Sequence, residues 1–128
     1  MKWLTGVAAA LAVATLLAGC ADEREKTEDE YLELWQELND TLDKVTDESS
    51  LRAALPELRK LNERLKAHAE RRKAMDAPTE ERRRQLLARQ SKDLTREAGR
   101  FGKNQRRIAG IKGKEELLEA IQDFGAEP

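Results

Sequence analysis

The chain has 128 residues, 38% of them charged and only 4% aromatic, and its formal net charge at pH 7 is −1. This composition excludes a dense enzyme-like core, and its abundance of Glu, Lys, Arg, Leu and Ala is typical of long helices and coiled coils. No alternation of apolar and polar residues after Cys20 predicts a strand. We therefore predict an all-α protein.

The N-terminal segment has the three zones of a secretory signal peptide. Lys2 carries a positive charge, an apolar stretch follows from residue 3 to residue 17, and small residues precede Cys20. This stretch of about 15 residues is shorter than the roughly 20 that a bilayer-spanning helix requires. It predicts a cleaved signal peptide over residues 1–19 rather than a permanent membrane span.

The last residues of that segment, Leu17-Ala18-Gly19-Cys20, resemble the lipobox of bacterial lipoproteins. The resemblance implies cleavage before Cys20, diacylglycerol on its thiol and usually a further acyl chain, such as palmitate, on the new amino group. Two or more chains anchor a protein stably to a membrane. With Ala21 rather than Asp after the cysteine, the resemblance implies the periplasmic face of the outer membrane more than the inner membrane. The alternative is an exported protein with one free cysteine.

Acidic and basic residues are segregated along the chain. Residues 22–48 hold 12 acidic and 3 basic side chains, residues 49–75 hold 3 and 8, residues 76–113 hold 5 and 11, and residues 114–128 hold 5 and 1. In a compact bundle, we expect the acidic first helix to lie against basic neighbours, with opposite charges flanking the apolar seam.

A lipidated, charged spacer at residues 20–29 is predicted to precede a helical domain at residues 30–124. The first helix is predicted over residues 24–45, because six apolar residues recur at intervals of three and four on one face. They are Tyr31, Leu34, Trp35, Leu38, Leu42 and Val45. Tyr31 and Trp35 are four residues apart, which fits a bundle core or, alternatively, a ligand platform.

A break at residues 46–50 supplies three candidate caps for the second helix, Asp47, Ser49 and Ser50. This helix is predicted to run to about residue 75. Pro56 conflicts with it, because a proline beyond the first turn removes a backbone donor and clashes with the preceding turn. Either the helix is kinked there, or it begins near Pro56 after a separate turn. Its predicted seam consists of Leu51, Ala54, Leu58, Leu61, Leu65, His68 and Met75.

His68, the only histidine, falls on that seam. A metal site would need further ligands, and the nearby carboxylates of Glu63 and Glu70 fall on other faces of the helix. We expect a packing or hydrogen-bonding role for His68, with a pH-dependent switch as the functional alternative.

The third helix is predicted to begin after Pro78, which ends the second helix, with Thr79 as its cap. A seven-residue apolar repeat is predicted to form its seam, with polar residues at the companion positions. The repeat is Leu87, Leu94, Phe101 and Ile108, and the companions are Gln90, Glu97 and Asn104. Gly99 and Gly102 each lower helix propensity by about 1 kcal/mol relative to Ala, which predicts a bend or loosening near them.

Basic residues follow a second seven-residue repeat, predicted on the opposite side of the third helix. They are Arg82, Arg89, Arg96 and Lys103, supplemented by Arg100 and Arg107 among others. These side chains are candidate contacts for anionic lipid headgroups or envelope polymers. The alternative is a solvated face partly neutralised by the acidic first helix. Nucleic acid is not expected, because an exported protein does not meet it and few aromatic residues are present to stack on bases.

A third break at residues 110–113 precedes a short helix predicted over residues 114–124, and residues 125–128 are predicted to be a tail. The expected architecture is an antiparallel three-helix bundle, or a coiled-coil-like helical hairpin, with this short fourth helix. Turn and seam residues at 46–50, 54–58 and 77–81 resemble those of small uncharacterised helical proteins of the bacterial envelope. That resemblance implies a fold and no activity.

The chain has no phosphate loop, nucleophile elbow, haem attachment motif or zinc signature. We therefore expect no enzyme, no cofactor and no small-molecule substrate. Two functions remain. One is a membrane-anchored helical module that engages another envelope protein or a second copy of itself, and the other is a binder of anionic envelope surfaces through the basic residues of the third helix.

Overall fold

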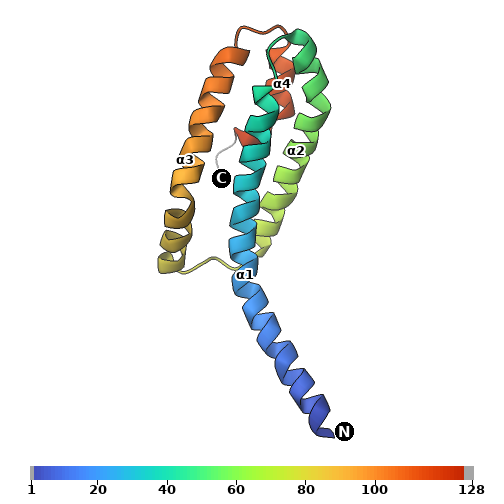
Figure 1. Cartoon of the computed structure of the whole chain (residues 1–128), viewed down its shortest axis with the longest axis vertical. Helices are drawn as coiled ribbons and strands as arrows, with labels where there is room; N and C mark the ends of the chain where they lie inside the picture. Colours follow the sequence, from blue (N-terminus) through green and yellow to red (C-terminus); the bar gives the residue numbers. More distant parts are fainter. Residues whose placement is uncertain (1, 126–128) are drawn as a thin grey trace.

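The computed structural model describes the backbone of residues 2–125 and the side chains of residues 23–125. All regular elements in this part are helical. In chain order they are α1 (Lys2–Asp43), α2 (Glu48–Ala74), α3 (Glu80–Ile108), α4 (Lys114–Ala120) and the 3-10 turn η1 (Gln122–Phe124). The predicted all-α class is confirmed. Consecutive long helices run in opposite directions (Figure 1).

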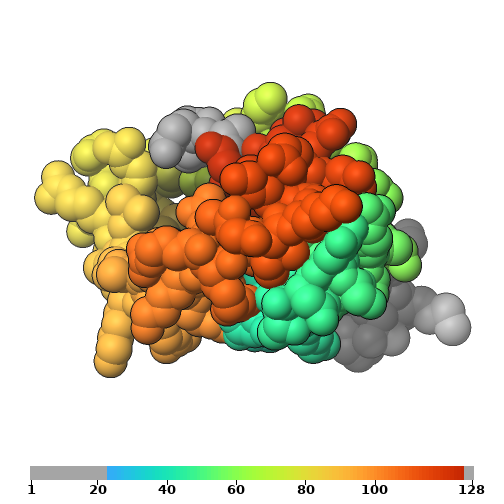
Figure 2. Space-filling view, turned by 90° about the horizontal axis from the view of Figure 1, so that it is seen from above, coloured from blue at the N-terminus to red at the C-terminus, as the bar shows by residue number. Residues whose placement is uncertain are grey.

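Helix α1 is the shared partner of the other two long helices. It packs against both α2 and α3, whereas α4 and η1 pack against α2. Figure 2 looks down on the end where the connection from α3 to α4 lies against the turn between α1 and α2. Gly113 of this connection faces Leu51 of α2 there, and it adopts a positive φ of 96° that favours glycine.

The hydrophobic core lies between α1, α2 and the α4–η1 end. Its buried members are Leu34, Leu38, Leu42, Val45, Leu51, Leu55, Leu58, Leu61, Leu65, Ile108, Leu117, Ala120, Ile121 and Phe124. This set confirms the predicted face of the first helix and most of the second seam, although Leu55 is buried where Ala54 was expected. Only Ile108 comes from α3. The leucine core therefore mainly holds α2 to α1. Helix α3 also packs Phe101 against this core, and its Leu86 is buried outside the cluster.

The start of α2 is closed by a reciprocal pair of hydrogen bonds. The Asp47 side chain accepts from the backbone amide of Ser50 at 2.8 Å, and the Ser50 hydroxyl accepts from the amide of Asp47 at 3.0 Å. Such a capping box satisfies amides that have no partner inside the helix. The helix begins at Glu48, so the later start near Pro56 is wrong. Pro56 lies on the exposed side, where water can bind the carbonyl oxygen that loses its donor.

Helix α3 differs from the prediction in which stripe it buries. The polar residues Gln90, Glu97 and Asn104 are buried, whereas Leu87 is 57% exposed. The predicted apolar seam is therefore confirmed at Ile108, which is buried, and at Phe101, which packs against the core, and it is wrong at Leu87, because the side of α1 that meets α3 also carries amide and carboxylate groups. The predicted loosening near Gly99 is also wrong, since α3 is a single helix over 29 residues. Its predicted cap is confirmed, with the Thr79 side chain accepting from the Arg82 amide at 3.2 Å.

The helical domain reaches back into the segment predicted as a spacer, because Glu25, Thr27 and Asp29 all contact α2 or α3. At the other end, the short helix predicted over residues 114–124 is present as α4 followed by η1. The predicted tail beyond Gly125 lies outside the described residues.

Candidate functional site

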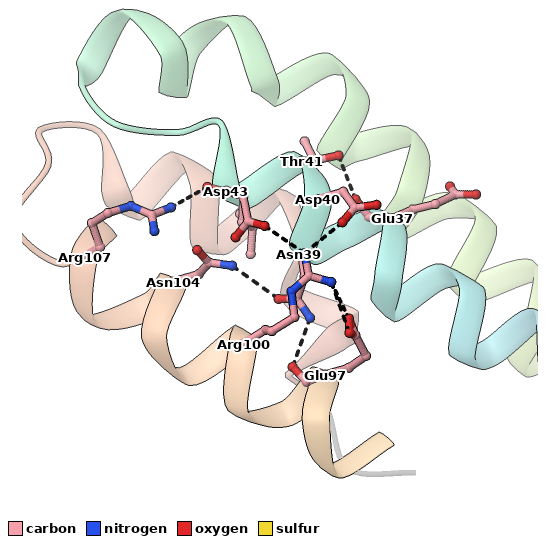
Figure 3. A network of polar contacts seen from close by, with 10 residues as sticks. Glu37, Asn39, Asp40, Thr41, Asp43, Glu97, Arg100, Asn104 and Arg107 are labelled. Carbon is pink, nitrogen blue, oxygen red and sulfur yellow. Dashed lines mark hydrogen bonds and ion pairs between the residues drawn. The ribbon is translucent and has the colours of Figure 1, made fainter. Parts of the chain in front are cut away.

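Polar side chains form much of the interface between α1 and α3 (Figure 3), next to the aromatic contact of Trp35 with Phe101. Asn39 of α1 donates from its side-chain amide to the backbone carbonyl of Glu97 at 2.9 Å. The Asn104 amide in turn donates to the Asn39 side-chain oxygen at 3.4 Å. All three side chains are buried. Because buried polar groups stabilise a fold only when they are hydrogen-bonded, these partners fix how α3 sits on α1.

Arg100 lies at the centre of this network (Figure 3). Its guanidinium donates to Asp40 at 2.8 Å, to Asp43 at 2.7 Å and to the buried Glu97 carboxylate at 2.5 Å. The hydrogen bonds to Asp40 and Asp43 are the main reason that the pKa of Arg100 is raised. The same guanidinium lowers the pKa of Asp43. One cation thus joins three carboxylates from two helices.

The first two residues of the predicted basic stripe also face α1. Arg82 donates to Glu25 at 2.8 Å, and Arg89 donates to Asp29 at 3.1 Å. These pairs extend the polar interface toward the start of α3. The prediction that the stripe faces away from the neighbouring helix is therefore wrong for Arg82 and Arg89.

The remaining stripe residues divide into two groups. Arg107 donates to the backbone carbonyls of Leu42 and Val45, at 2.6 and 3.2 Å, and so fastens the end of α3 to α1. Arg96 pairs within α3, with Asp93 at 3.1 Å. Of the six candidates, four therefore contact α1.

Lys103, the sixth candidate, belongs to the outer face of α3. Four basic residues on this face have no acidic partner within 4 Å among residues 23–125. They are Arg84, Lys92, Lys103 and Arg106. Any contact with an external anionic surface would therefore be made by these four side chains and not by the whole predicted stripe.

Opposite charges also flank the interface between α1 and α2. Arg71 pairs with Glu30 at 3.0 Å, and Arg64 pairs with Glu37. The expected packing of an acidic first helix against basic neighbours is therefore confirmed on both sides. Each pair is largely exposed, so each contributes little to stability by itself.

His68 is buried beside α1, with 1% of its surface exposed. Its Nε2 atom lies 2.7 Å from the backbone carbonyl of Thr27, and because a carbonyl only accepts, Nε2 must carry the hydrogen. The ring stacks on Tyr31 with centroids 5.7 Å apart. The predicted packing and hydrogen-bonding role is confirmed. Among residues 23–125, no three potential ligands are placed to hold a metal ion.

A cavity of about 890 Å³ opens beside this histidine, between α1, α2 and η1. Its lining residues are Tyr31, Trp35, Leu65, Lys66, His68, Ala69, Glu70, Arg72, Lys73, Asp123 and Phe124. Trp35 is among them and contacts both Phe101 and Phe124 edge-on, each with ring centroids 5.2 Å apart. Tyr31 and Trp35 are only half-buried. They thus pack in the core with one side and face the cavity with the other.

The apolar repeat of α3 leads away from this cavity. Leu87 and Leu94 precede Phe101 by two and one heptads, so all three share one face of α3. Phe101 contacts Trp35 of α1, which lines the cavity, so the stripe starts at the edge of the cavity, although no residue of α3 lines it. We use the name docking groove for two neighbouring surfaces together, the cavity and the stripe of Leu87 and Leu94. The sequence did not reveal this surface, because the repeat of Leu87 and Leu94 was expected in the core. The seven-residue spacing of Gln90, Glu97 and Asn104 was the signal that a second, polar stripe could be buried instead.

Two predicted features fall outside the described side chains, namely the signal segment and the lipidation site Cys20. From residue 23 to residue 125, no helix is long and apolar enough to cross a membrane. No protein family model, no curated protein and no solved structure matches the chain.

Proposed function

We propose that this chain is a lipid-anchored helical module of the bacterial envelope, which binds another envelope protein through the docking groove. The observation that carries the proposal is the exposed Leu87, which heads an apolar stripe of α3 that continues through the half-buried Leu94. Leu87 is 57% exposed although it belongs to a regular apolar repeat. The polar repeat beside it already makes the hydrogen bonds with α1, such as the one from Asn39 to the Glu97 carbonyl. An apolar stripe at this spacing is the surface that a neighbouring helix buries.

The sequence before the described side chains supports the membrane anchor. Leu17-Ala18-Gly19-Cys20 resembles a lipobox, and the apolar segment before it is short for a span. Cys20 precedes the groove residue Tyr31 by 11 residues. An acylated Cys20 would therefore keep the groove close to the membrane surface, where integral and peripheral envelope proteins are accessible.

Metabolic labelling with a fatty acid tests the anchor. The wild-type chain and a Cys20→Ala variant are expressed, labelled and fractionated. We expect label in the wild type, in the outer-membrane fraction, and none in the variant. Absence of label from both proteins would show that Cys20 is an ordinary cysteine and would refute the anchor.

Site-specific photocrosslinking in cells tests the groove. A photoreactive amino acid is placed at Leu87 or, as a matched control, at the exposed outer-face residue Thr95. We expect an adduct with another protein from position 87 only, lost when Leu94→Ser is added. Equal adducts from both positions, or none from position 87, would contradict binding through the groove.

A second candidate function is contact with anionic envelope surfaces. The observation that favours it is the set of outer-face residues without acidic partners, which includes Lys92 and Lys103. Cosedimentation of the Cys20→Ala variant with anionic and neutral vesicles tests it. Binding through these charges should favour anionic vesicles and weaken steeply with salt, since exposed charges are screened beyond about 8–10 Å at physiological ionic strength. Equal binding to both vesicles would refute it.

A further inference from the structure

Helix α3 is attached to the rest of the protein differently from the other helices. It packs mainly against α1, whereas α4 and η1, which follow it in the chain, pack against α2. Among residues 23–125, the leucine core joins α1, α2, α4 and η1 and includes Ile108 as its one buried member from α3. The main contacts among those four elements therefore do not depend on α3.

Polar contacts form much of the attachment of α3 to α1. Arg82 and Arg89 donate to α1 carboxylates at 2.8 and 3.1 Å. Both ion pairs are partly exposed, so each contributes little to stability. The buried contact between Asn104 and Asn39 selects one register, but it stabilises the interface less than well-packed apolar side chains would. Helix α3 is thus held more by matching polar partners than by burial of apolar surface.

The packing of α3 is also interrupted at both of its ends. At its start, a hollow of about 500 Å³ is lined by residues 74–79, by Arg82 and by the neighbouring residues of α1. At its end, a cavity of about 180 Å³ lies between α3 and α4, and both Ile108 and Leu117 line it. Atoms that face such a space lose the dispersion contacts of close packing. The connections at both ends of α3, residues 75–79 and 109–113, therefore border loosely packed regions.

We propose that α3 is a strap that detaches from α1 while α1, α2, α4 and η1 remain folded. An element held by few buried apolar contacts opens at a lower free energy than the rest of a protein. Opening separates Phe101 from Trp35, the contact that joins the two surfaces of the docking groove. It also uncovers the side of α1 that carries Asn39 and Asp40. The position of α3 thereby controls whether the groove is complete. That consequence rests on the proposed function, whereas the opening itself does not.

Native-state hydrogen exchange tests the opening. The full-length chain in micelles of a neutral detergent is exchanged, and amides inside α3, at residues 86–104, are compared with amides inside α2, at residues 55–68. Relative to their intrinsic rates, we expect the α3 amides to exchange at least about tenfold faster than the α2 amides. Equal protection of the two helices would overturn the strap, because α3 would then open only when the whole domain unfolds.

A core variant distinguishes separate opening from global unfolding. Leu58 of α2 is fully buried in the leucine core, which persists when α3 opens. Leu58→Ala should therefore speed exchange in α2 at least about tenfold and leave exchange in α3 unchanged. Equal acceleration of both helices would overturn the strap.

A second variant tests what holds the strap closed. Arg100→Ala leaves the buried Glu97 carboxylate without its cation in the closed state, whereas water reaches this carboxylate in the open state. It should speed exchange in α3 at least about tenfold. Arg96→Ala, the matched control, removes an ion pair within α3 and should change this rate by less than about threefold. Equal effects of the two variants would overturn a strap held by the polar interface.

Limited proteolysis with trypsin checks the opening without any variant. The interiors of α2 and α3 both contain several arginines and lysines, so the number of cleavage sites does not favour either helix. Cleavage requires an open backbone, and we expect the first interior cuts between residues 89 and 103, with Arg59 and Lys60 still intact. First cuts at Arg59 or Lys60, or simultaneous cuts in both helices, would overturn the strap. Such a failure would not overturn the proposed function, which photocrosslinking from position 87 tests separately.

Discussion

Asn39 of α1 and Asn104 of α3 face each other inside the protein, with the Asn104 amide donating to the Asn39 oxygen at 3.4 Å. Both side chains are essentially inaccessible to water. A buried polar pair between two helices restricts their register at some cost in stability, because any shifted register leaves a buried amide without a partner. This pairing explains why α3 turns its polar heptad toward α1 and leaves Leu87 outside.

The coupling between these asparagines predicts a non-additive mutant cycle. Asn39→Leu should lower the free energy of unfolding by about 1–3 kcal/mol, because the buried Asn104 amide loses its acceptor. The double variant with Asn104→Leu should lose clearly less free energy of unfolding than the two single variants lose together, since both polar groups are then absent. Urea unfolding of the four proteins measures the cycle. Strict additivity would contradict the coupling.

Removal of Arg100 should destabilise the protein more than removal of its neighbour in the same stripe. Arg100→Ala leaves the Glu97 carboxylate, which is 1% exposed, without its cation, and we expect a loss of about 2–3 kcal/mol. Arg96→Ala removes an exposed pair with Asp93 and should cost about 1 kcal/mol or less. Chemical unfolding measures the free energy of unfolding of both variants. Equal decreases in the two variants would show that the network around Arg100 contributes little to stability.

Stability should depend on pH through Asp43. The Arg100 guanidinium holds the pKa of this carboxyl below its ordinary value of 3.8, with smaller contributions from Asn104 and Arg107. A carboxyl with a lowered folded-state pKa stabilises the protein at every pH above its unfolded pKa, and the contribution disappears as the pH falls through the folded value. Thermal unfolding should therefore show a Tm that declines below about pH 4.

The variant Asp43→Asn tests the source of that decline. Its Tm should be lower than that of the wild type at pH 7. This Tm should fall less on acidification, because the titrating carboxyl is gone. Glu119→Gln, on the exposed side of α4, is the matched control and should keep the decline of the wild type. An unchanged decline in Asp43→Asn would assign the effect to other carboxylates.

The same substitution should have opposite effects at two glycines. Gly99→Ala should stabilise the protein by about 0.5–1 kcal/mol, because Gly99 lies inside α3 and an added Cβ meets nothing within 4 Å. Gly113→Ala should destabilise it by about 1–2 kcal/mol, because alanine is strained at a φ of 96° and its Cβ would lie 3.3 Å from Leu51. Paired unfolding curves measure both, and a stabilising Gly113→Ala would contradict the backbone geometry described for the α3–α4 connection.

The sequence by itself determined the elements of the fold. Spacing of three and four residues placed Leu34, Leu38 and Leu42 on the buried face of α1, since only one face of a surface helix can leave water. Local chemistry also located the ends of helices, because a cap such as Thr79 acts on amides within the next turn. Among the three candidate caps of α2, however, only the folded backbone selected Asp47.

Tertiary structure alone decided which stripe of α3 is buried. Two heptads, one apolar and one polar, run along this helix, and by hydrophobicity the stripe of Leu87 and Leu94 should face inward. The side of α1 that packs against α3 is polar, and this polar surface, not hydrophobicity, determined which stripe is buried. Where α1 presents Asn39, Asp40 and Asp43, a leucine would leave the buried Asn39 amide unpaired and would remove the cation of the two carboxylates, whereas Glu97, Arg100 and Asn104 supply these partners. Complementarity between two helices is a property of the pair, so neither helix's own periodicity could reveal it.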